Sequence, residues 1–589
     1  MDTSRVLIAV ILSLAIVFAY QELVLKRIYP PPSQQAAEQA KAAKAAESRA
    51  LANAPASKAS SVAGPGAVSS TPAGSMTSAP GAVASSTAAS GAQVKALASA
   101  ATATSAEERT IEIDSDYWVA LLTTRGARLK SFRLKRYQEK AAADSGWYEM
   151  VSMSPGGHLP LGVVMTRDGE VLGDQDLIYA ASAGSSATAP KDRIDVTGAE
   201  AKVSFTAVTA DGTKIEKTFT FHPSSYVFEM DVAVAGGPPL QQIGVSMSQP
   251  LTAHLGYYDI PELQADVKDK VLTQDEKNLR KGVEPVSGPI TYAGFGDRYF
   301  LSVFLPQSPS VGTLAMAYAG DEAVARLLFP GANQVKTRVY MGPKLLDTLD
   351  AANPALHKAI DFGWAGILAL VFLRTLKLFH LIAPNYGVDI ILLTIALRIV
   401  FLPLSIKSQR SMMKMQRLQP QMERLREKYK DNNEQLQKEM VDLYKRNHVN
   451  PLGGCAPMAL QLPIFIGLYE ALLNSIELRH APFIGWINDL STPDCLHISW
   501  LPQLPMLQCH GLPVLVLLMG LSSFAQQYMT PTSPDPSQQR MMMLTPLIFT
   551  IMLINFPAGL SLYYFSSNML GVIQQFFLNR EFKQYSPAT

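Results

Sequence analysis

The stretch GVDIILLTIALRIVFLPLSI, residues 387–406, is apolar over a whole helix length and carries one basic residue near its middle, Arg398. A bilayer-spanning helix needs about 20 consecutive apolar residues. A charged side chain at the centre of such a helix costs about 2.5–3.5 kcal/mol on insertion scales, so it marks a functional site by default. The alternative is a buried helix of a soluble core in which Arg398 pairs with a carboxylate. Further long apolar runs downstream favour the membrane interpretation.

The composition places the apolar residues in two parts of the chain. The 589 residues are 48% hydrophobic and 17% charged, with a formal net charge of +2, so the averages alone would fit a soluble protein. The apolar residues are concentrated in 4–25 and 360–580. Three cysteines make no disulfide framework, and the sequence has no CxxC or HExxH spacing, so we expect no metal. It has no Walker A or GxGxxG pattern either, so we expect no nucleotide cofactor.

The first 106 residues predict a membrane anchor followed by a linker. Residues 1–28 contain one apolar segment behind a short polar start. Because no A-x-A-like cleavage site follows it, an uncleaved signal anchor is favoured over a cleaved signal peptide. Residues 29–106 are rich in Ala, Ser, Gly, Pro and Thr. Such a tract buries too little apolar surface to offset the entropy lost on ordering, so we expect a disordered linker.

Residues 107–350 show the alternation of a β domain. Lys214–Phe221 (KIEKTFTF) and Tyr226–Val234 (YVFEMDVAV) alternate apolar with polar residues, and turns such as Ala210-Asp211-Gly212 separate these runs. The pattern predicts an antiparallel all-β sandwich with one core. No catalytic or ligand chemistry can be read from it, because its histidines are scattered without partners at fixed spacing.

The region 351–589 is helical and largely apolar. Residues 360–382 predict an amphipathic helix in the membrane interface, because Arg374, Lys377 and His380 share one face. Five membrane spans are predicted after it, at 387–406, 455–478, 511–529, 541–557 and 558–578. With the N-terminal anchor they give a six-span membrane protein in which five helices form the C-terminal core.

The distribution of basic residues sets the expected orientation. The segment 407–450 carries eleven Lys and Arg, whereas 479–510 carries only Arg479. By the positive-inside rule the first segment is cytoplasmic and the second lies outside. Both termini are then cytoplasmic and the β domain lies outside. The charges flanking the first apolar segment favour the opposite, but we give the larger loop more weight.

The cytoplasmic segment 407–450 predicts a helical hairpin, with helices at 408–429 and 433–447. Apolar residues recur along its first helix at intervals of three or four: Met412, Met415, Leu418, Met422 and Leu425. They predict a seam between the two helices or, since Met is flexible and polarisable, an adaptable surface for apolar segments of other proteins. The basic residues suggest contact with anionic lipid or ribosomal RNA. Six acids among them exclude a purely nucleic-acid-binding patch, and no DNA binding is expected.

Polar residues recur inside the predicted spans and must face one another or water. Thr394 lies one helical turn before Arg398, and Gln461 and Glu470 lie in the second of the five spans. Interhelical hydrogen bonding explains many of these groups. It does not explain Arg398, for which Glu470 is the only acid that we expect at a similar depth.

Several motifs resemble the bacterial YidC membrane insertase family (YidC/Oxa/Alb), in its Gram-negative form with a large periplasmic domain. The motifs are Asn450-Pro451-Leu452-Gly453-Gly454-Cys455, Gln461-Leu462-Pro463-Ile464-Phe465, Glu477-Leu478-Arg479, Ala481-Pro482-Phe483 and Phe556-Pro557-Ala558-Gly559-Leu560. The resemblance is strong over the C-terminal 230 residues. The anchor, linker and β domain also fit this form, so the resemblance extends over the whole chain.

The resemblance implies a non-enzymatic insertase and chaperone of the inner membrane, multi-pass, with a hydrophilic groove. The residues that match groove positions of the family are Arg398, Thr394, Gln461 and Tyr564, the second of the pair Tyr563-Tyr564, and Trp486 matches a tryptophan near the outer interface. Glu470 stands where the family leads us to expect an aromatic residue, which leaves its role open. The implied partners are nascent membrane proteins, the Sec translocon, the lipid bilayer and, through the hairpin, the ribosome and targeting factors.

A groove centred on Arg398 suggests a mechanism without bond chemistry. Arg398 attracts the polar tail of a nascent protein, while the client's apolar segment slides into lipid beside Tyr564. A second interpretation is an ion- or solute-coupled transporter, but the internal repeats typical of that class are not found. A third is an enzyme acting on cell-envelope material. It would need a reactive constellation among the outer-loop histidines, which lack fixed spacing.

Two cysteines, Cys495 and Cys509, fall in the predicted outer loop. An oxidising compartment permits a disulfide between them. Two free thiols are the alternative.

Overall fold

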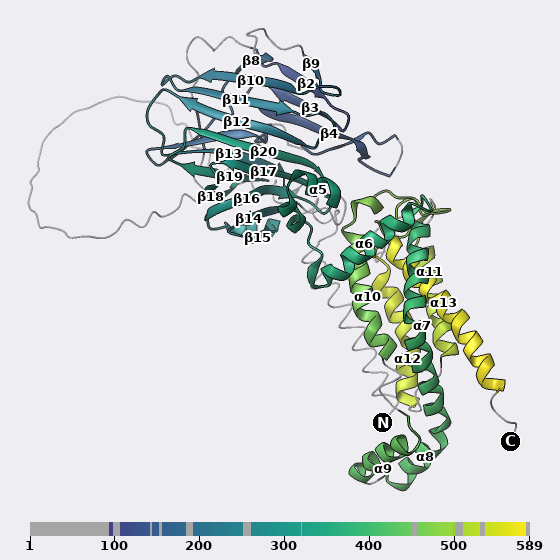
Figure 1. Ribbon diagram of the computed structural model, residues 1–589. Helices are drawn as coiled ribbons and strands as arrows, with labels where there is room; N and C mark the ends of the chain where they lie inside the picture. The colour runs from purple at the N-terminus through teal and green to yellow at the C-terminus, as the bar shows by residue number, and fades with distance from the viewer. Residues whose placement is uncertain are drawn as a thin grey trace, which may run out of the picture. The chain divides into compact units, whose positions relative to one another are not determined.

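The computed structural model (Figure 1) describes residues 94–97, 107–141, 144–151, 156–183, 192–250, 261–319, 321–430, 432–449, 456–498, 500, 511–530 and 536–584. The predicted anchor, 1–28, and nearly all of the predicted linker, 29–106, lie outside these residues.

The predicted β region is mostly β-sheet. Its strands are β1 (Lys95–Ala96), β2 (Thr110–Asp114), β3 (Trp118–Thr123), β4 (Arg128–Gln138), β5 (Trp147–Glu149), β6 (Gly162–Arg167), β7 (Glu170–Gly173), β8 (Ala180–Ala183), β9 (Arg193–Asp195), β10 (Ala201–Val208), β11 (Lys214–Phe221), β12 (Val227–Ala235), β13 (Gln242–Pro250), β14 (Glu262–Val267), β15 (Lys270–Gln274), β16 (Val286–Gly296), β17 (Phe300–Ser308), β18 (Val311–Ala319), β19 (Glu322–Pro330) and β20 (Gln334–Pro343). They form a 15-stranded sheet and a 5-stranded sheet of order β5-β4-β3-β2-β9. One short helix, α4 (Glu276–Lys281), lies among them.

Alternation explains how the strands build the core. In β11, Ile215, Lys217, Phe219 and Phe221 point inward and are buried, while Glu216, Thr218 and Thr220 between them are partly exposed. This period of two is what a strand buried on one face requires. The prediction of antiparallel pairing holds for most neighbours, but β1 pairs with β7 and β2 with β9 in parallel.

Strand β1 falls inside the predicted linker 29–106. Residues 95 and 96 pair with Leu172 and Gly173 at the edge of the larger sheet. Leu97, which is 8% exposed, packs into the core of the β domain. The Ala-rich composition hid this strand, because two paired residues and one apolar anchor are too short to appear as a pattern.

The remaining chain is helical. Its elements are α5 (Leu346–Ala352), η3 (Pro354–Ala359), η4 (Gly363–Ala365), α6 (Gly366–His380), α7 (Tyr386–Arg417), α8 (Gln419–Lys428), α9 (Asn433–Arg446), α10 (Ala456–Leu473), η6 (Ile476–Leu478), α11 (Val514–Met529), α12 (Pro536–Leu553) and α13 (Ala558–Gln584), with the short strands β21 (Leu496–His497) and β22 (Gly511–Leu512) between α10 and α11.

Helix α7 contains the stretch 387–406 but continues beyond it. Asn385 caps its start, where the side-chain Oδ1 accepts hydrogen bonds from the backbone N–H groups of Gly387 and Val388. The helix then runs through Pro403 to Arg417. The predicted hairpin helix 408–429 is therefore wrong as a single unit. Its first half is the end of α7, and α8 begins after Leu418, where Pro420 occupies the first turn as prolines commonly do.

Other helix boundaries also differ from the predicted spans. Helix α10 ends at Leu473, before the 3₁₀ turn that completes the predicted span 455–478. Helix α11 starts at Val514, since Gly511–Leu512 is a strand. Helix α12 ends at Leu553 and α13 begins at Ala558, so the motif around Phe556-Pro557 is the break between them.

Among the described residues, one helix, Tyr386–Arg417, is long and apolar enough to cross a bilayer by length and composition. Three shorter apolar helical stretches accompany it, at Gln461–Leu473, Val514–Met529 and Met542–Leu553. The predicted count of six spans is therefore not confirmed.

Helices α8 and α9 form the predicted hairpin (Figure 1). Leu418, Met422 and Val449 are buried in a small core of their own, against which Met415 and Met440 pack. The prediction of an apolar seam between the two helices is thus confirmed for Met415, Leu418 and Met422.

Candidate substrate groove around Arg398

Arg398 lies in α7 and reaches across to α13. Its Nη2 donates hydrogen bonds to the backbone carbonyl of Ser567, at 2.5 Å, and to the Ser567 hydroxyl, at 3.0 Å. Both acceptors are neutral. The guanidinium is therefore hydrogen-bonded while its positive charge remains uncompensated by these partners.

The backbone of α13 leaves room for this contact at Gly571. A Cβ added there would lie 3.2 Å from Nη2 of Arg398 and 2.4 Å from Nε2 of Gln526 on α11. Any larger residue would push one of these two polar side chains away. The glycine thus lets groups from three helices, α7, α11 and α13, approach one point.

Gln461 and the tyrosine pair stand on neighbouring helices. Gln461, on α10, donates through Nε2 to the hydroxyl of Tyr563 on α13 at 2.8 Å. Tyr563 is only 2% exposed. Tyr564 is partly buried against Phe465 and Phe549, with ring centroids 6.0 Å away in each case. Both tyrosines lie near Arg398. The structure thus brings Arg398, Gln461, Tyr563 and Tyr564 together as a set.

Thr394 lies on the same helix as Arg398, but its hydroxyl does not point a hydrogen bond toward Arg398. It is 1% exposed, and its hydroxyl donates to the carbonyl of Ile390, 2.7 Å away in its own helix. A buried threonine commonly satisfies itself in this way. Thr394 therefore sits near the site without directing a hydrogen bond to it.

Glu470 faces a different neighbourhood from that of Arg398. One of its carboxylate oxygens accepts a hydrogen bond from Asn474 at 3.0 Å, and its side chain approaches Gly363. Asn474 also donates to the carbonyl of Asp361 at 3.0 Å. Asn474 thus links the Glu470 carboxylate to the segment before α6, while neutral groups hold Arg398.

Trp486 is anchored by an acid that the sequence did not single out. Its indole Nε1 donates to Oδ1 of Asp494 at 2.8 Å, and Oδ2 of the same carboxylate accepts from the backbone N–H of Leu515 at the start of α11. Burial raises the pKa of Asp494 above its usual range. One carboxylate thus ties the loop after α10 to the next helix and fixes the indole.

Cys495 is disulfide-bonded. The other two cysteines, Cys455 and Cys509, lie outside the described residues.

Sequence reasoning missed Ser567, Gly571 and Asp494. Ser567 is the residue before Asn568, which donates instead to Ser523 on α11 at 2.6 Å. The two neighbours therefore contact different helices from adjacent positions of α13, a division that the helical period allows but does not specify. Gln574, almost two turns further, donates to Ser405 on α7 at 3.0 Å. Within the described part of the chain, no group of three or more His, Cys, Asp or Glu could hold a metal ion.

Comparison with known proteins identifies both halves of the chain. A family model described as 60Kd inner membrane protein matches residues 378–585, and one described as YidC periplasmic domain matches residues 110–374. The membrane protein insertase YidC of Geotalea daltonii is 34% identical over 486 residues, which cover 80% of this chain and 87% of that protein. The membrane protein insertase YidC of Syntrophobacter fumaroxidans is 36% identical over 482 residues, which cover 77% and 83%. The chain therefore belongs to the YidC family of inner-membrane protein insertases, in the form with a periplasmic β-sheet domain and without enzymatic activity.

Proposed function

We propose that Arg398 is the positive centre of a groove that receives the polar tail of a nascent membrane protein. The observation that carries this proposal is the set of partners of Arg398, which are the carbonyl and the hydroxyl of Ser567. An arginine closed in an ion pair would have its charge compensated. An arginine held by neutral acceptors keeps its charge for an anionic group that arrives later.

The surroundings of Arg398 suit the transient binding of a peptide. In a medium of low dielectric constant, a positive charge attracts carboxylates and carbonyl oxygens more strongly than in water. Gln461 and Tyr563 are neutral polar groups that can exchange their present hydrogen bond for bonds to a peptide, and the neutral amide of Gln526 lies beside Gly571. Such a site shortens the dry part of the path across about 30 Å of hydrocarbon. Transfer of the client's apolar segment into lipid, beside Tyr564, drives the step without a nucleotide.

The orientation and the partners form part of the proposal. We place both termini in the cytoplasm and propose six spans, with Trp486 near the outer interface and a disulfide between Cys495 and Cys509. The excess of basic residues in 407–450 supports the cytoplasmic position of the α8–α9 hairpin. We propose that this hairpin meets the ribosome and targeting factors, and that the protein works alone or with the Sec translocon.

Reconstitution into proteoliposomes tests the groove. The client is a small single-span protein with two acidic residues in its translocated tail, and a second client carries Asn in their place. Arg398→Ala should lower insertion of the acidic client by about ten-fold or more, with a smaller effect on the Asn client, because one desolvated charge contact is worth more than 1.4 kcal/mol. Arg398→Lys should retain most of the activity.

Lys407→Ala is the matched control, since it removes an exposed positive charge from the same helix. Normal insertion of the acidic client by Arg398→Ala, or equal losses for the two clients, would rule out a charge-centred groove.

A further inference from the structure

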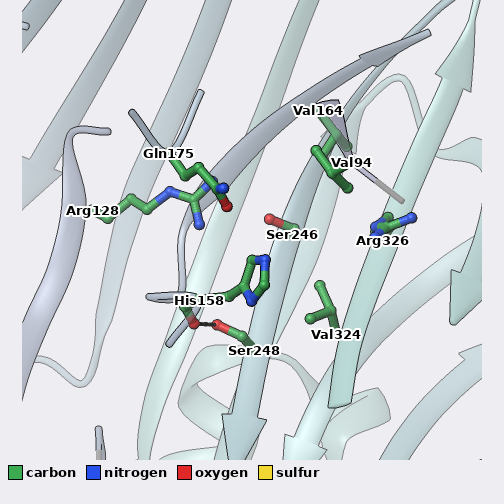
Figure 2. A pocket seen from close by; sticks show the side chains of 9 residues that line it. All are labelled: Val94, Arg128, His158, Val164, Gln175, Ser246, Ser248, Val324 and Arg326. Carbon is green, nitrogen blue, oxygen red and sulfur yellow. Dashed lines mark hydrogen bonds between the residues drawn. The ribbon is translucent and has the colours of Figure 1, made fainter. Parts of the chain in front are cut away.

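Two pockets of the described chain differ in what they can hold. The first lies in the β domain, beside the strands that carry Ser246 and Val324 (Figure 2). Its free volume is about 10 Å³, so it has room for one water molecule. The second has a free volume of about 470 Å³, within the range of about 300–1,000 Å³ that ligand sites occupy. The second pocket is therefore large enough for a small ligand.

The wall of the second pocket comes from two parts of the chain. Strands β4 and β5 of the β domain supply one side, and the turn after helix α10 supplies the other. The described residues of 88–531, which include both sides, pack as one compact unit. Basic and apolar side chains share the wall, among them Lys135, Arg136, Arg479, Trp147, Leu345 and Ile476.

Arg136 presents hydrogen-bond donors that no described residue uses. Its guanidinium carbon lies 3.9 Å from the ring centroid of Tyr117, which packs in turn on Tyr226 with a centroid distance of 5.0 Å. Stacking of this kind holds the guanidinium plane and leaves its N–H edge open. Among the described residues, Arg136 forms no hydrogen bond and no ion pair. Its N–H groups are therefore available to the oxygens of a ligand.

Arg479 lines the pocket from the other side and is held by neutral groups. Its Nη1 donates to the backbone carbonyl of Gln138 at 2.8 Å, and its Nη2 donates to that of Glu139 at 3.2 Å. The guanidinium carbon also lies 5.0 Å from the ring centroid of Tyr148. These carbonyls and this ring carry no charge, so the positive charge of Arg479 is not compensated by them.

The acids around the pocket are bonded to other groups. Glu477 pairs with Lys377 at 3.2 Å, and Lys135 pairs with Asp114. The carboxylate of Glu139 accepts from the backbone N–H of Glu149, and that of Asp489 accepts from the backbone N–H of His480. No described carboxylate therefore has to leave Arg136 or Arg479 before an anion can bind.

The pocket lies at the end of a predicted membrane span. Ile476 belongs to the span 455–478, and Arg479 follows it directly. Trp147, on the opposite wall, is 46% exposed. Lipid headgroups lie at the ends of spans, where tryptophan is enriched and basic side chains meet phosphates. This position, which rests on the proposed span, favours a lipid headgroup over a soluble phosphate, because the apolar part of the wall then has a partner.

We propose that this pocket binds the headgroup of an anionic phospholipid. The phosphodiester oxygens accept hydrogen bonds from Arg136 and Arg479, because a guanidinium can donate to two phosphate oxygens at once. The glycerol and the first acyl carbons lie against Trp147 and Ile476. A bound lipid then bridges strand β4 and the turn after α10. This site is separate from the groove around Arg398.

Titration of the full-length protein in neutral detergent tests the proposal. The probes are a short-chain phosphatidylglycerol, the matching zwitterionic phosphatidylcholine and inorganic phosphate. The phosphatidylglycerol should bind about ten-fold more tightly than either other probe, because it alone combines net negative charge with an apolar part. Arg136→Gln should weaken its binding about five-fold, as expected for one charge contact that water partly screens. Arg125→Gln is the control, since it removes an exposed arginine of the same domain outside the pocket.

A second comparison adds a charge to the wall and keeps both arginines. Trp147→Glu places a carboxylate there, whereas Trp147→Gln has nearly the same shape without the charge. The Glu variant should bind phosphatidylglycerol about five-fold more weakly than the Gln variant. Thermal unfolding checks that each variant is folded.

Equal affinities for the two lipids, unchanged binding in Arg136→Gln, or equal binding by the two Trp147 variants would overturn the proposal. Binding of inorganic phosphate as tight as that of phosphatidylglycerol would overturn the lipid assignment in favour of a soluble anion. Because the titration is performed in detergent without a client protein, these outcomes do not depend on the groove around Arg398.

Discussion

The β domain holds fully buried basic side chains and the helical domain holds the partly buried Arg398, and the two domains satisfy these groups in different ways. In the β domain, Lys217 is fully buried and donates to the carbonyls of Gly126 and Leu161, while Asp174 pairs with both Lys217 and Arg128. In the helical domain, Arg398 is held by the carbonyl and hydroxyl of Ser567. In the first arrangement a carboxylate compensates the positive charges. In the second, the hydrogen-bond acceptors are neutral and the charge of Arg398 is not compensated by them.

This difference separates a structural cluster from a site that can act on a client. A buried charge with an ionised partner is fixed, and removal of that partner is strongly destabilising. A charge held by neutral acceptors can exchange them for an anion. The partners of a buried basic residue are therefore more informative about its role than its burial.

The largest expected effect follows from Asp174→Asn. It removes the carboxylate that serves both Lys217 and Arg128, and leaves two buried positive charges without compensation. We expect the free energy of unfolding of the β domain to fall by about 3–5 kcal/mol. Denaturant titration of the full chain measures this change. Asp192→Asn, which removes an exposed ion pair with Arg109, is the control and should change nothing measurable. A small loss in Asp174→Asn would contradict the closed cluster.

A smaller loss of stability is expected from Arg398→Met. This variant keeps the length of the side chain and leaves the carbonyl and hydroxyl of Ser567 without a donor, which costs about 1–3 kcal/mol. Thermal unfolding in detergent should therefore show a folded helical domain, while insertion of an acidic-tailed client is lost. If unfolding of the helical domain accompanied the loss of insertion, Arg398 would be structural like Lys217.

Two buried lysines, Lys217 and Lys344, make the stability of the β domain depend on pH. Burial lowers the pKa of Lys217 and of Lys344 to about 8. Between pH 8 and the ordinary lysine pKa, the unfolded chain binds protons that the folded chain does not. These two groups therefore make stability rise with pH in that window, by up to about 1.4 kcal/mol per pH unit for each. Below pH 8 both states are protonated and the contribution is flat.

Lys344→Met removes one of these two groups and should flatten the rise. Unfolding titrations of the full chain at pH 7, 8, 9 and 10 measure it, with the exposed Lys214→Met as the control. If the slope of stability against pH were unchanged in Lys344→Met, the pKa of Lys344 would not be lowered in the folded protein.

The smallest effect is expected from Ser567→Ala, which removes the hydroxyl but leaves the backbone carbonyl to accept from Arg398. The free energy of unfolding should fall by about 0.5–1.5 kcal/mol, the net worth of one hydrogen bond. Insertion should fall less than in Arg398→Ala. Gly571→Ala should have the larger functional effect of the two, because its Cβ displaces Gln526 or Arg398. Loss of insertion in Ser567→Ala as complete as in Arg398→Ala would indicate that the hydroxyl itself meets the client.

The sequence predicted the β region, the helical region and the hairpin because their periodicities are strong. It missed the exact helix boundaries, since Leu418 and the segment 474–478 end helices by local backbone geometry and not by a change in hydropathy. It also missed Lys217, although the alternation KIEKTFTF places this lysine on the same face as Ile215 and Phe219. The available signal was a lysine at a position where the alternation predicts a buried apolar residue.

By itself, the sequence determined the two-part architecture, the family, and Arg398 as an unusual charge, because each is a property of spacing along one segment. Only the tertiary structure decided the partner of Arg398, the separate neighbourhood of Glu470, and the pairing of Asp174 with Lys217 and Arg128. These depend on which faces of distant segments meet. A one-dimensional pattern specifies the faces of a helix or strand, but it does not specify which partner lies opposite each face.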